Sequence, residues 1–296
     1  MKKLLMLLSI CCVLLLVFGC SESPRVTEPT GQTSLGTLVQ RPQFIENRPE
    51  SVIQQHILAT STSLLAEKRP PKPPPDTTPT GDDPNPNPAH KYAYIVGIAD
   101  YDGTVNDLQY PDDDAMDMKA YFQSQGFSIR MDLNRSATAD AIVAGLQWLV
   151  ASAQPGDEIL FSYSGHGGKA PGYGSSIIST DLYYVTHGYV MQIFNSANCT
   201  KKLVTLDACV IGDFNSDCQI GSIVATASNK TNSYDAPDLK NGAWTYYFVE
   251  AAAGLGYPYA EDVATYAEDG MRAWASQYNL NVSPKHTDKY TGMFDM

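Results

Sequence analysis

Short apolar runs alternate with longer amphipathic stretches over the last two thirds of the chain. The apolar runs predict strands buried on both faces, and they cover residues 92–99, 128–133, 158–164, 202–208 and 222–227. The amphipathic stretches predict helices, and they cover residues 112–125, 138–153, 189–196, 243–253 and 260–278. Because strands separated by helices usually form parallel sheets, we expect an α/β fold, a three-layer α/β/α sandwich with a largely parallel sheet.

Capping and turn residues mark the ends of these elements. Acidic side chains fill the first turn of the 112–125 helix, where they complement its dipole, and Gly126 follows its last turn. Thr138 has the side chain of a helix N-cap, and Pro155-Gly156-Asp157 forms a turn before the strand at 158–164. These signals support the order of strands and helices given above.

The beginning of the chain has the pattern of a signal peptide over residues 1–19. Two lysines precede an apolar run from Leu4 to Phe18, which is shorter than the roughly 20 residues of a transmembrane helix. The run ends in Phe18-Gly19-Cys20, which resembles the lipobox of bacterial lipoproteins. We therefore expect acylation of Cys20 and an exported domain anchored to the membrane of the cell envelope. An uncleaved anchor or cleavage elsewhere would also imply export.

The segments between the signal peptide and the folded part are polar. Residues 20–68 predict a spacer or a pro-segment, with one helix over Ser51 to Lys68. Residues 69–90 are rich in proline and predict an extended linker. The folded domain is then residues 91–296, which is long enough for a hydrophobic core of its own.

The net charge narrows the class of partner that the protein could bind. A net charge of −12 argues against nucleic acid and anionic membrane surfaces as partners, because like charges repel.

Outside the first 20 residues the cysteines are Cys199, Cys209 and Cys218. In an oxidising compartment Cys199 and Cys218 could pair and leave Cys209 as a thiol, although the sequence does not fix that geometry. We expect no zinc site, because no C-x-x-C or H-x₃-H spacing occurs.

Two predicted strands end in residues suited to a nucleophile and a base. The strand at 158–164 leads into Gly165-His166-Gly167-Gly168, and the strand at 202–208 leads into Cys209. Functional sites gather at the carboxyl ends of parallel strands, so both side chains should reach one crevice. An imidazole activates a thiol and later protonates a leaving amine. We predict a dyad of His166 and Cys209, with the amides of Gly167 and Cys209 as an oxyanion hole.

The order of these motifs resembles the caspases and metacaspases over about residues 91–296. The segment 141–169, which contains Tyr163-Ser164-Gly165-His166-Gly167, is similar to the catalytic-histidine segment of metacaspases. Asp207-Ala208-Cys209, Ser233-Tyr234 and the segment 242–247 follow in the family's order. The resemblance implies a caspase-like fold and a cysteine endopeptidase that acts on protein or peptide substrates and requires no cofactor. It gives His166 the role of general acid and base and Cys209 that of nucleophile.

The resemblance also implies a specificity pocket. The family's acidic pocket corresponds to Asp114, Ser164 and Asp207, which would favour Arg or Lys at the cleavage position. In the alternative interpretation, Asp114 only begins a helix and Asp207 only satisfies a turn.

Calcium activation is a further property of many metacaspases. Asp112, Asp113 and Asp117 are clustered carboxylates of the kind that hard cations prefer, and a solvated helix start explains them equally well.

Some residues depart from the family pattern or leave alternatives open. The segment Cys209-Val210-Ile211-Gly212 replaces the family's common Cys-His-Ser-Gly. His187 precedes a predicted helix and is expected to be a loop residue rather than the base.

One alternative function is that of an inactive caspase-fold module that binds partners or acts as a scaffold on the envelope. Another is a legumain-like or clostripain-like peptidase of the same clan, which would cleave after a different residue.

Overall fold

The described part of the chain comprises residues 43–60 and 81–296 of a computed structural model. The predicted signal peptide and Cys20 lie outside these residues, as do parts of the predicted spacer and linker. The described residues all belong to one compact unit, Leu35–Met296. Within the two described ranges, no helix has both the length and the apolar character needed to cross a membrane.

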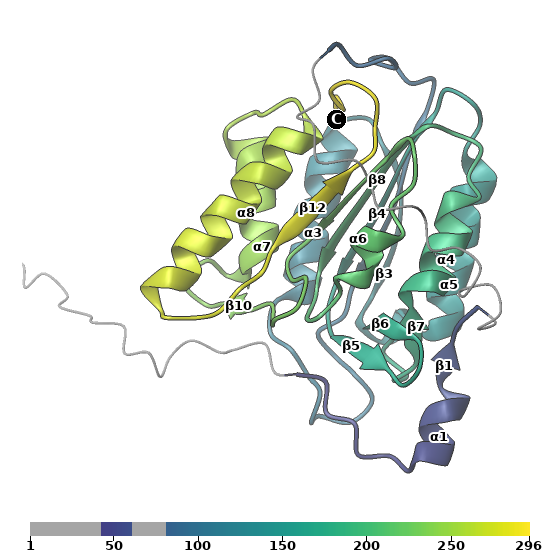
Figure 1. Ribbon diagram of the computed structural model, residues 1–296, viewed down its shortest axis with the longest axis vertical. Helices are drawn as coiled ribbons and strands as arrows, with labels where there is room; N and C mark the ends of the chain where they lie inside the picture. Colours follow the sequence, from purple (N-terminus) through teal and green to yellow (C-terminus); the bar gives the residue numbers. More distant parts are fainter. Residues whose placement is uncertain (1–42, 61–80) are drawn as a thin grey trace, which may run out of the picture. The chain divides into compact units, whose positions relative to one another are not determined.

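A six-stranded sheet forms the centre of the fold (Figure 1). Its order is β12-β9-β8-β4-β2-β3, and all neighbours are parallel except β12, which is antiparallel to β9. The strands are β2 (Lys91–Gly97), β3 (Ser128–Leu133), β4 (Glu158–Ser164), β8 (Lys201–Asp207), β9 (Ser222–Thr226) and β12 (Lys285–Asp288). The five predicted strands are confirmed, and the edge strand β12 was not predicted.

Helices cover both faces of this sheet, which confirms the three-layer α/β/α arrangement (Figure 1). One face carries α4 (Ala139–Ser152) and α5 (His187–Asn195). The other carries α3 (Pro111–Ser124), α7 (Ala243–Val249) and α8 (Ala260–Gln277). A one-turn helix, α6 (Asp213–Ser216), follows β8, and a π-helical turn, Glu250–Gly254, extends α7.

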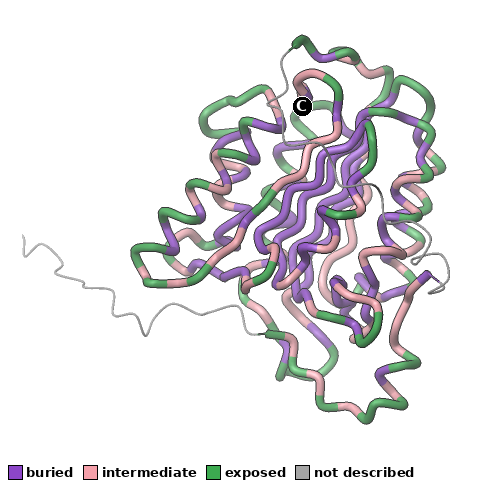
Figure 2. Tube along the Cα trace, in the orientation of Figure 1, coloured by how far each residue is buried: buried purple, intermediate pink, exposed green. Residues whose placement is uncertain are grey.

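Alternation along β2 divides the core into two clusters. Tyr94 and Val96 pack in the cluster that contains the apolar residues of α4, whereas Ala93 and Ile95 pack in the cluster that contains those of α3. Because both faces are buried, the strand has no polar face, and this explains its continuous apolar sequence. Figure 2 shows the same burial along the neighbouring central strands.

Local sequence signals set the ends of the helices as expected. The Thr138 side chain accepts a hydrogen bond from the Ala141 amide at 3.2 Å and caps α4. Pro111 occupies the first turn of α3, and Gly126 follows that helix with φ of +86°, a conformation that glycine adopts without strain. A Cβ on Gly145 would lie 2.0 Å from the Tyr94 ring, so this glycine lets α4 approach β2 closely.

A second, four-stranded sheet of order β1-β7-β6-β5 was not predicted. Its strands are β1 (Ile57–Leu58), β5 (Gly167–Ala170), β6 (Gly174–Ile178) and β7 (Tyr184–Thr186), and a small hairpin pairs β10 (Asp235–Ala236) with β11 (Asn241–Gly242). The expected helix over Ser51 to Lys68 is wrong for residues 57–58, and residues 61–68 lie outside the described part of the chain. The helix α1 spans Glu50–Gln55, because Ile57 and Leu58 pair with β7 instead of continuing it.

Candidate active site

The structure brings the ends of β4 and β8 together. Ser164 pairs with Asp207 in the register of the two strands, and the Gly165 amide donates to the Asp207 carbonyl at 3.2 Å. His166 and Cys209 each follow two residues later, so both predicted dyad residues leave the sheet at the same edge. The two candidates therefore lie at the carboxyl-end edge of the sheet, where the sequence analysis expected a shared site.

Gly167 packs directly on the main chain of Cys209. A Cβ at this position would lie 2.1 Å from the Cys209 carbonyl oxygen and 3.0 Å from its nitrogen, so no other residue fits without a shift of the backbone. The two residues proposed for the oxyanion hole are therefore neighbours in space. An acyl-transfer site needs such closely placed backbone N–H groups to bind a developing oxyanion.

The imidazole of His166 is oriented by a main-chain group. Its Nε2 lies 2.8 Å from the carbonyl oxygen of Asn106. A carbonyl oxygen only accepts, so Nε2 carries the proton in the neutral ring, and Nδ1 carries the lone pair that takes up a proton. Two rings pack against the imidazole: Tyr101 at 4.9 Å and Phe44 at 5.8 Å between centroids.

Two buried tyrosines hold the main chain of His166. The His166 amide donates to Tyr101 Oη at 2.7 Å, and Tyr163 Oη donates to the His166 carbonyl at 2.8 Å. A Cβ on Gly165 would lie 2.6 Å from both hydroxyl oxygens, so a glycine is needed beside them. The sequence analysis assigned no role to Tyr101 or Tyr163. Gly165, at the end of the strand, was the only local sign in the sequence that two side chains pack closely against the backbone here.

The nucleophile candidate lies on a strained turn. Val210, directly after Cys209, has φ of +49°, which is unusual for a β-branched residue. Its amide donates to the Thr231 carbonyl at 3.0 Å, and the Ile211 amide donates to the Ser228 carbonyl at 3.1 Å. These bonds maintain the left-handed conformation that the sequence disfavours.

The sulfur of Cys209 contacts a residue that also reaches the predicted pocket. The Ser233 amide donates to Cys209 Sγ at 3.3 Å, and the thiol donates to the Ser233 carbonyl at 3.8 Å. The Ser233 hydroxyl donates to Asp207. Ser233 belongs to a motif noted in the sequence, but its link between the nucleophile and the pocket depends on the tertiary fold.

The three predicted pocket residues are brought together and almost fully buried. Ser164 Oγ donates to Asp114 Oδ2 at 2.6 Å, and the Gly242 amide donates to Asp114 Oδ1 at 2.8 Å. Asp207 Oδ2 accepts from the amide and hydroxyl of Thr245 at 3.1 and 3.0 Å. Neutral donors thus orient both carboxylates without cancelling their negative charge.

The predicted calcium ligands do not form a ligand set. Asp112 accepts from the Asn134 side chain at 3.0 Å, and Asp117 accepts from the Asn241 side chain at 2.9 Å. Although Asp113 is exposed, some desolvation and the neighbouring charges of Asp112 and Asp117 raise the pKa of its carboxyl group. Across residues 43–60 and 81–296, no three His, Cys, Asp or Glu side chains are placed to hold a metal ion together.

Cys199 and Cys218 are buried, free thiols and do not form the disulfide considered in the sequence analysis. Burial raises the pKa of Cys199 to about 11 and that of Cys218 to about 12. Both groups therefore stay protonated and unreactive at neutral pH.

The expectation that His187 is a loop residue is wrong. It is the first residue of α5, and its Nδ1 lies 2.5 Å from Asp217 Oδ2. The ring therefore makes a hydrogen bond that joins α5 to the residue after α6.

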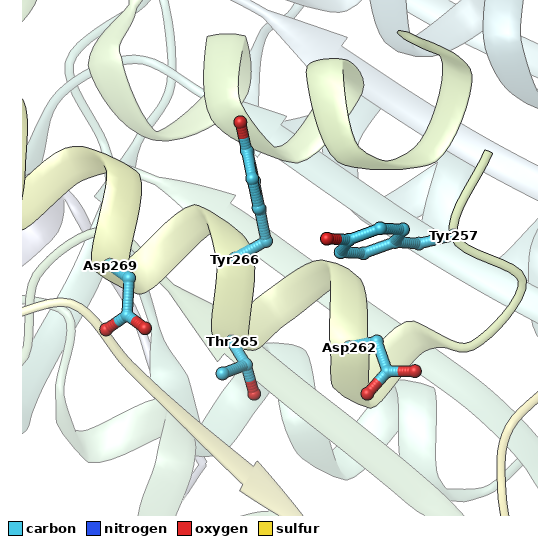
Figure 3. Close-up of a pocket in the computed structure, with 5 residues that line it drawn as sticks. All are labelled: Tyr257, Asp262, Thr265, Tyr266 and Asp269. Atoms are coloured by element: carbon cyan, nitrogen blue, oxygen red, sulfur yellow. The ribbon is translucent and has the colours of Figure 1, made fainter. Parts of the chain in front are cut away.

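A hollow of about 400 Å³ on α8 is lined by Tyr257, Asp262, Thr265, Tyr266 and Asp269. Figure 3 shows the Tyr257 ring directed at Tyr266, whose own hydroxyl points away from Tyr257, whereas the side chains of Asp262, Thr265 and Asp269 leave α8 on the other side. The carboxylates do not converge on the aromatic rings. We therefore do not assign this hollow to the catalytic site.

Comparisons with known proteins identify the family of the chain. Residues 90–279 match the family model of the caspase domain. Metacaspase-1 of Candida albicans is 26% identical over 156 residues, which cover 45% of this chain and 34% of that protein. Metacaspase-1 of Schizosaccharomyces pombe is 32% identical over 116 residues, which cover 35% and 27%. The chain thus spans about a third or less of these relatives.

A solved structure has a similar fold. The crystal structure of a protein from Geobacter sulfurreducens matches with a TM-score of 0.54, covering 68% of this chain and 94% of that one. The sequence identity is 15%, so the likeness concerns the fold alone.

Proposed function

The chain belongs to the caspase domain family, and on that premise we propose that it is a cysteine endopeptidase with Cys209 as nucleophile and His166 as general acid and base. The observation that carries the proposal is the packing of Gly167 on the main chain of Cys209 at the shared end of β4 and β8. This packing supports an oxyanion-binding site beside the Cys209 thiol. The imidazole of His166, which follows β4, is oriented by a hydrogen bond next to it.

The chemistry then follows in two steps. In the first, His166 Nδ1 takes the thiol proton and Cys209 Sγ attacks the scissile carbonyl carbon. The carbonyl oxygen becomes an oxyanion, which the amides of Gly167 and Cys209 stabilise. The imidazolium then gives its proton to the leaving amine, the C–N bond breaks, and a thioester remains. In the second step His166 deprotonates water, which attacks the thioester and releases a carboxylic acid and the Cys209 thiol.

The buried carboxylates support cleavage after Arg or Lys. Asp114 and Asp207 are held by neutral donors, so the pocket keeps a negative charge that a guanidinium or ammonium group complements. An Asp side chain at the same position would be repelled. The same chemistry speaks against a legumain-like preference for Asn, since a neutral amide would leave the two charges unpaired.

Two further parts of the proposal concern regulation and location. Calcium activation draws no support from Asp112, Asp113 and Asp117, which do not converge, so the proposed chemistry includes no metal ion. Export and anchoring through Cys20 are proposed from the lipobox-like sequence at residues 17–20. Palmitate labelling of cells that is lost in Cys20→Ala would support this anchor, and unchanged labelling would contradict it.

The function is tested with peptides that carry Arg, Lys, Asn or Asp at the cleavage position, with and without calcium. We expect cleavage after Arg or Lys that disappears in Cys209→Ala and persists in Cys218→Ala, the matched variant at a buried thiol. Cleavage after Asn would favour the legumain-like alternative. Complete inactivity of the wild-type protein would favour the binding module.

A further inference from the structure

The proposed dyad is closed off from solvent. His166 is 0% exposed and Cys209 is 1% exposed. A peptide carbonyl therefore has no route to the sulfur in this arrangement. The residues that cover the dyad come in part from the N-terminal side of the domain, in the segment 43–58, which we call the strap.

The strap contacts His166 directly and reaches a residue close to Cys209. The Phe44 ring packs edge-on to the imidazole of His166 at 5.8 Å. Gln43 Nε2 donates to Asn232 Oδ1 at 3.1 Å, and Asn232 directly precedes Ser233, whose amide bonds Cys209 Sγ. The first two residues of the strap thus contact the surroundings of both the base and the nucleophile.

A side-chain amide binds the main chain of the strap. The Ile45 amide donates to Asn106 Oδ1 at 3.0 Å, and Asn106 Nδ2 donates to the Ile45 carbonyl at 3.4 Å. Paired contacts of this kind recognise an extended backbone whatever its side chains are. The carbonyl of the same Asn106 accepts from His166, so this binding point lies immediately beside the imidazole.

The rest of the strap follows the edge of the small sheet. The Arg48 guanidinium donates to the Leu182 carbonyl at 2.8 Å. Further along, β1 adds to β7 as a parallel strand, and the Tyr184 amide donates to the His56 carbonyl at 2.8 Å (Figure 1). This is strand addition to an exposed sheet edge, a common mode of peptide binding.

We propose that the surface from Asn232 past Asn106 to the edge of β7 is a binding site for an extended peptide, which the strap occupies in the closed state. The inference rests on the proposed function, since the peptide that displaces the strap is the substrate. The peptide it fits is one that offers a free main-chain N–H and C=O to Asn106 and an apolar ring to His166. Strap and substrate then compete, and the strap lowers activity until it is released.

Release of the strap requires little disruption of the core. Of its apolar residues only Ile53 is fully buried, Phe44, Ile57 and Leu58 pack partly buried against the core, and Ile45 is 46% exposed. A segment with one fully buried apolar side chain opens locally before the domain unfolds. The strap therefore has the loose anchoring expected of a competitive cover rather than that of a core element.

The test measures how fast iodoacetamide alkylates Cys209 in the full chain, with the modified peptide identified by mass spectrometry. The double variant Phe44→Ala, Ile45→Pro removes the ring contact and the amide that bonds Asn106. We expect alkylation about tenfold faster, because a ring contact and a hydrogen bond are lost. The matched control is Ile220→Ala, at a position 84% exposed and outside the strap, which should alkylate at the wild-type rate.

A second measurement keeps the inference falsifiable if the double variant is less stable. A synthetic peptide of residues 43–58, added to that variant, should slow the alkylation of Cys209 again. Equal alkylation rates in wild type and variant, with no effect of the peptide, would overturn the inference. Alkylation needs no peptidase activity, so faster labelling without peptide cleavage would refute only the proposed function, and cleavage with unchanged labelling would refute only the strap.

Discussion

The Nε2 atom of His166 lies 2.8 Å from the main-chain carbonyl oxygen of Asn106, so a backbone group helps to orient the imidazole. This contact fixes which ring nitrogen takes up the thiol proton. It also means that the orientation depends on how well the surrounding main chain is held. The tyrosine hydroxyls that bond the backbone of His166 are therefore the first place to test the account.

The substitution Tyr101→Phe should slow catalysis without changing the fold. It removes the hydroxyl that accepts the His166 amide at 2.7 Å and leaves a buried N–H without that acceptor, which costs about 1 to 3 kcal/mol. We expect kcat to fall on the order of tenfold with KM little changed, and the acidic limb of the pH profile to shift as the imidazole moves. Kinetics of peptide cleavage over a range of pH measure both effects.

The matched control for this prediction is Tyr92→Phe. Tyr92 lies on β2, packs its ring against Trp148 of α4 and is only partly buried. It should keep wild-type kcat and pH profile. Equal losses in both variants would indicate a general effect of removing a phenol and would contradict a positioning role for Tyr101.

The substitution Asp114→Asn tests the pocket. Asp114 is fully buried at the start of α3 and bonded to Ser164 and to the Gly242 amide. Loss of its charge should reduce kcat/KM for Arg peptides about 100-fold, since a charged pair in a buried site contributes several kcal/mol.

Asp113→Asn is the control on the same helix, because Asp113 is exposed. It should change kcat/KM for Arg peptides less than about twofold, as expected for a screened surface charge. A large loss in Asp113→Asn with none in Asp114→Asn would place the cation-binding group elsewhere.

A buried ion pair at the opposite end of β8 should matter for stability rather than catalysis. Lys201 Nζ lies 2.8 Å from Asp83 Oδ2 and 3.5 Å from Glu158 Oε2, with the lysine side chain 0% exposed. Lys201→Met leaves two buried carboxylates without this cation and should lower the free energy of unfolding by about 3–5 kcal/mol.

Chemical denaturation measures this effect, with Lys230→Met as the reference variant. Lys230 is exposed and makes its hydrogen bond through the backbone, so its replacement should change stability by less than about 0.5 kcal/mol. A wild-type unfolding midpoint in Lys201→Met would show that the pair adds nothing to stability.

The raised pKa of Glu261 predicts how the free energy of unfolding depends on pH. Burial raises its pKa to about 7, above the ordinary value of 4.5, although its carboxylate accepts from the Phe294 amide. Because the folded state holds this proton more tightly than the unfolded state, stability should fall as pH rises from about 4.5 to 7. Glu261→Gln should flatten that fall by about 1 to 2 kcal/mol, as measured by urea unfolding at pH 5 and pH 7.5. An identical pH dependence in both proteins would contradict the assignment.

The main sheet, and the placement of His166 and Cys209 at one edge of it, could be predicted because their signals are local. His166 and Cys209 follow apolar runs at the ends of two parallel strands, and topology alone brings such ends together. Asn106 and Tyr101 lie in the irregular segment between β2 and α3, where no periodic pattern exists. Their role arises only when that segment folds over the imidazole.

Other elements escaped prediction for different reasons. The residues between β5 and β6, Pro171-Gly172-Tyr173, carry a turn signal that marks a hairpin, and the sequence analysis did not use it. The edge strand β12 has the sequence Lys-His-Thr-Asp and joins the sheet through backbone pairing with β9, so it has no apolar pattern to detect. The strap is polar and weakly patterned, and tertiary contacts alone place it at the dyad.

The most direct test of the account locates the nucleophile by covalent trapping. The full chain and the Phe44→Ala, Ile45→Pro variant are incubated with a peptidyl chloromethyl ketone that carries Arg at the cleavage position, and the adduct is mapped by mass spectrometry. The account predicts one adduct, on Cys209, that is lost in His166→Ala and is suppressed by excess Arg peptide. An adduct that forms equally well on Cys199 or Cys218, or none on Cys209 in either protein, would contradict the claim that this chain is a cysteine endopeptidase with this dyad.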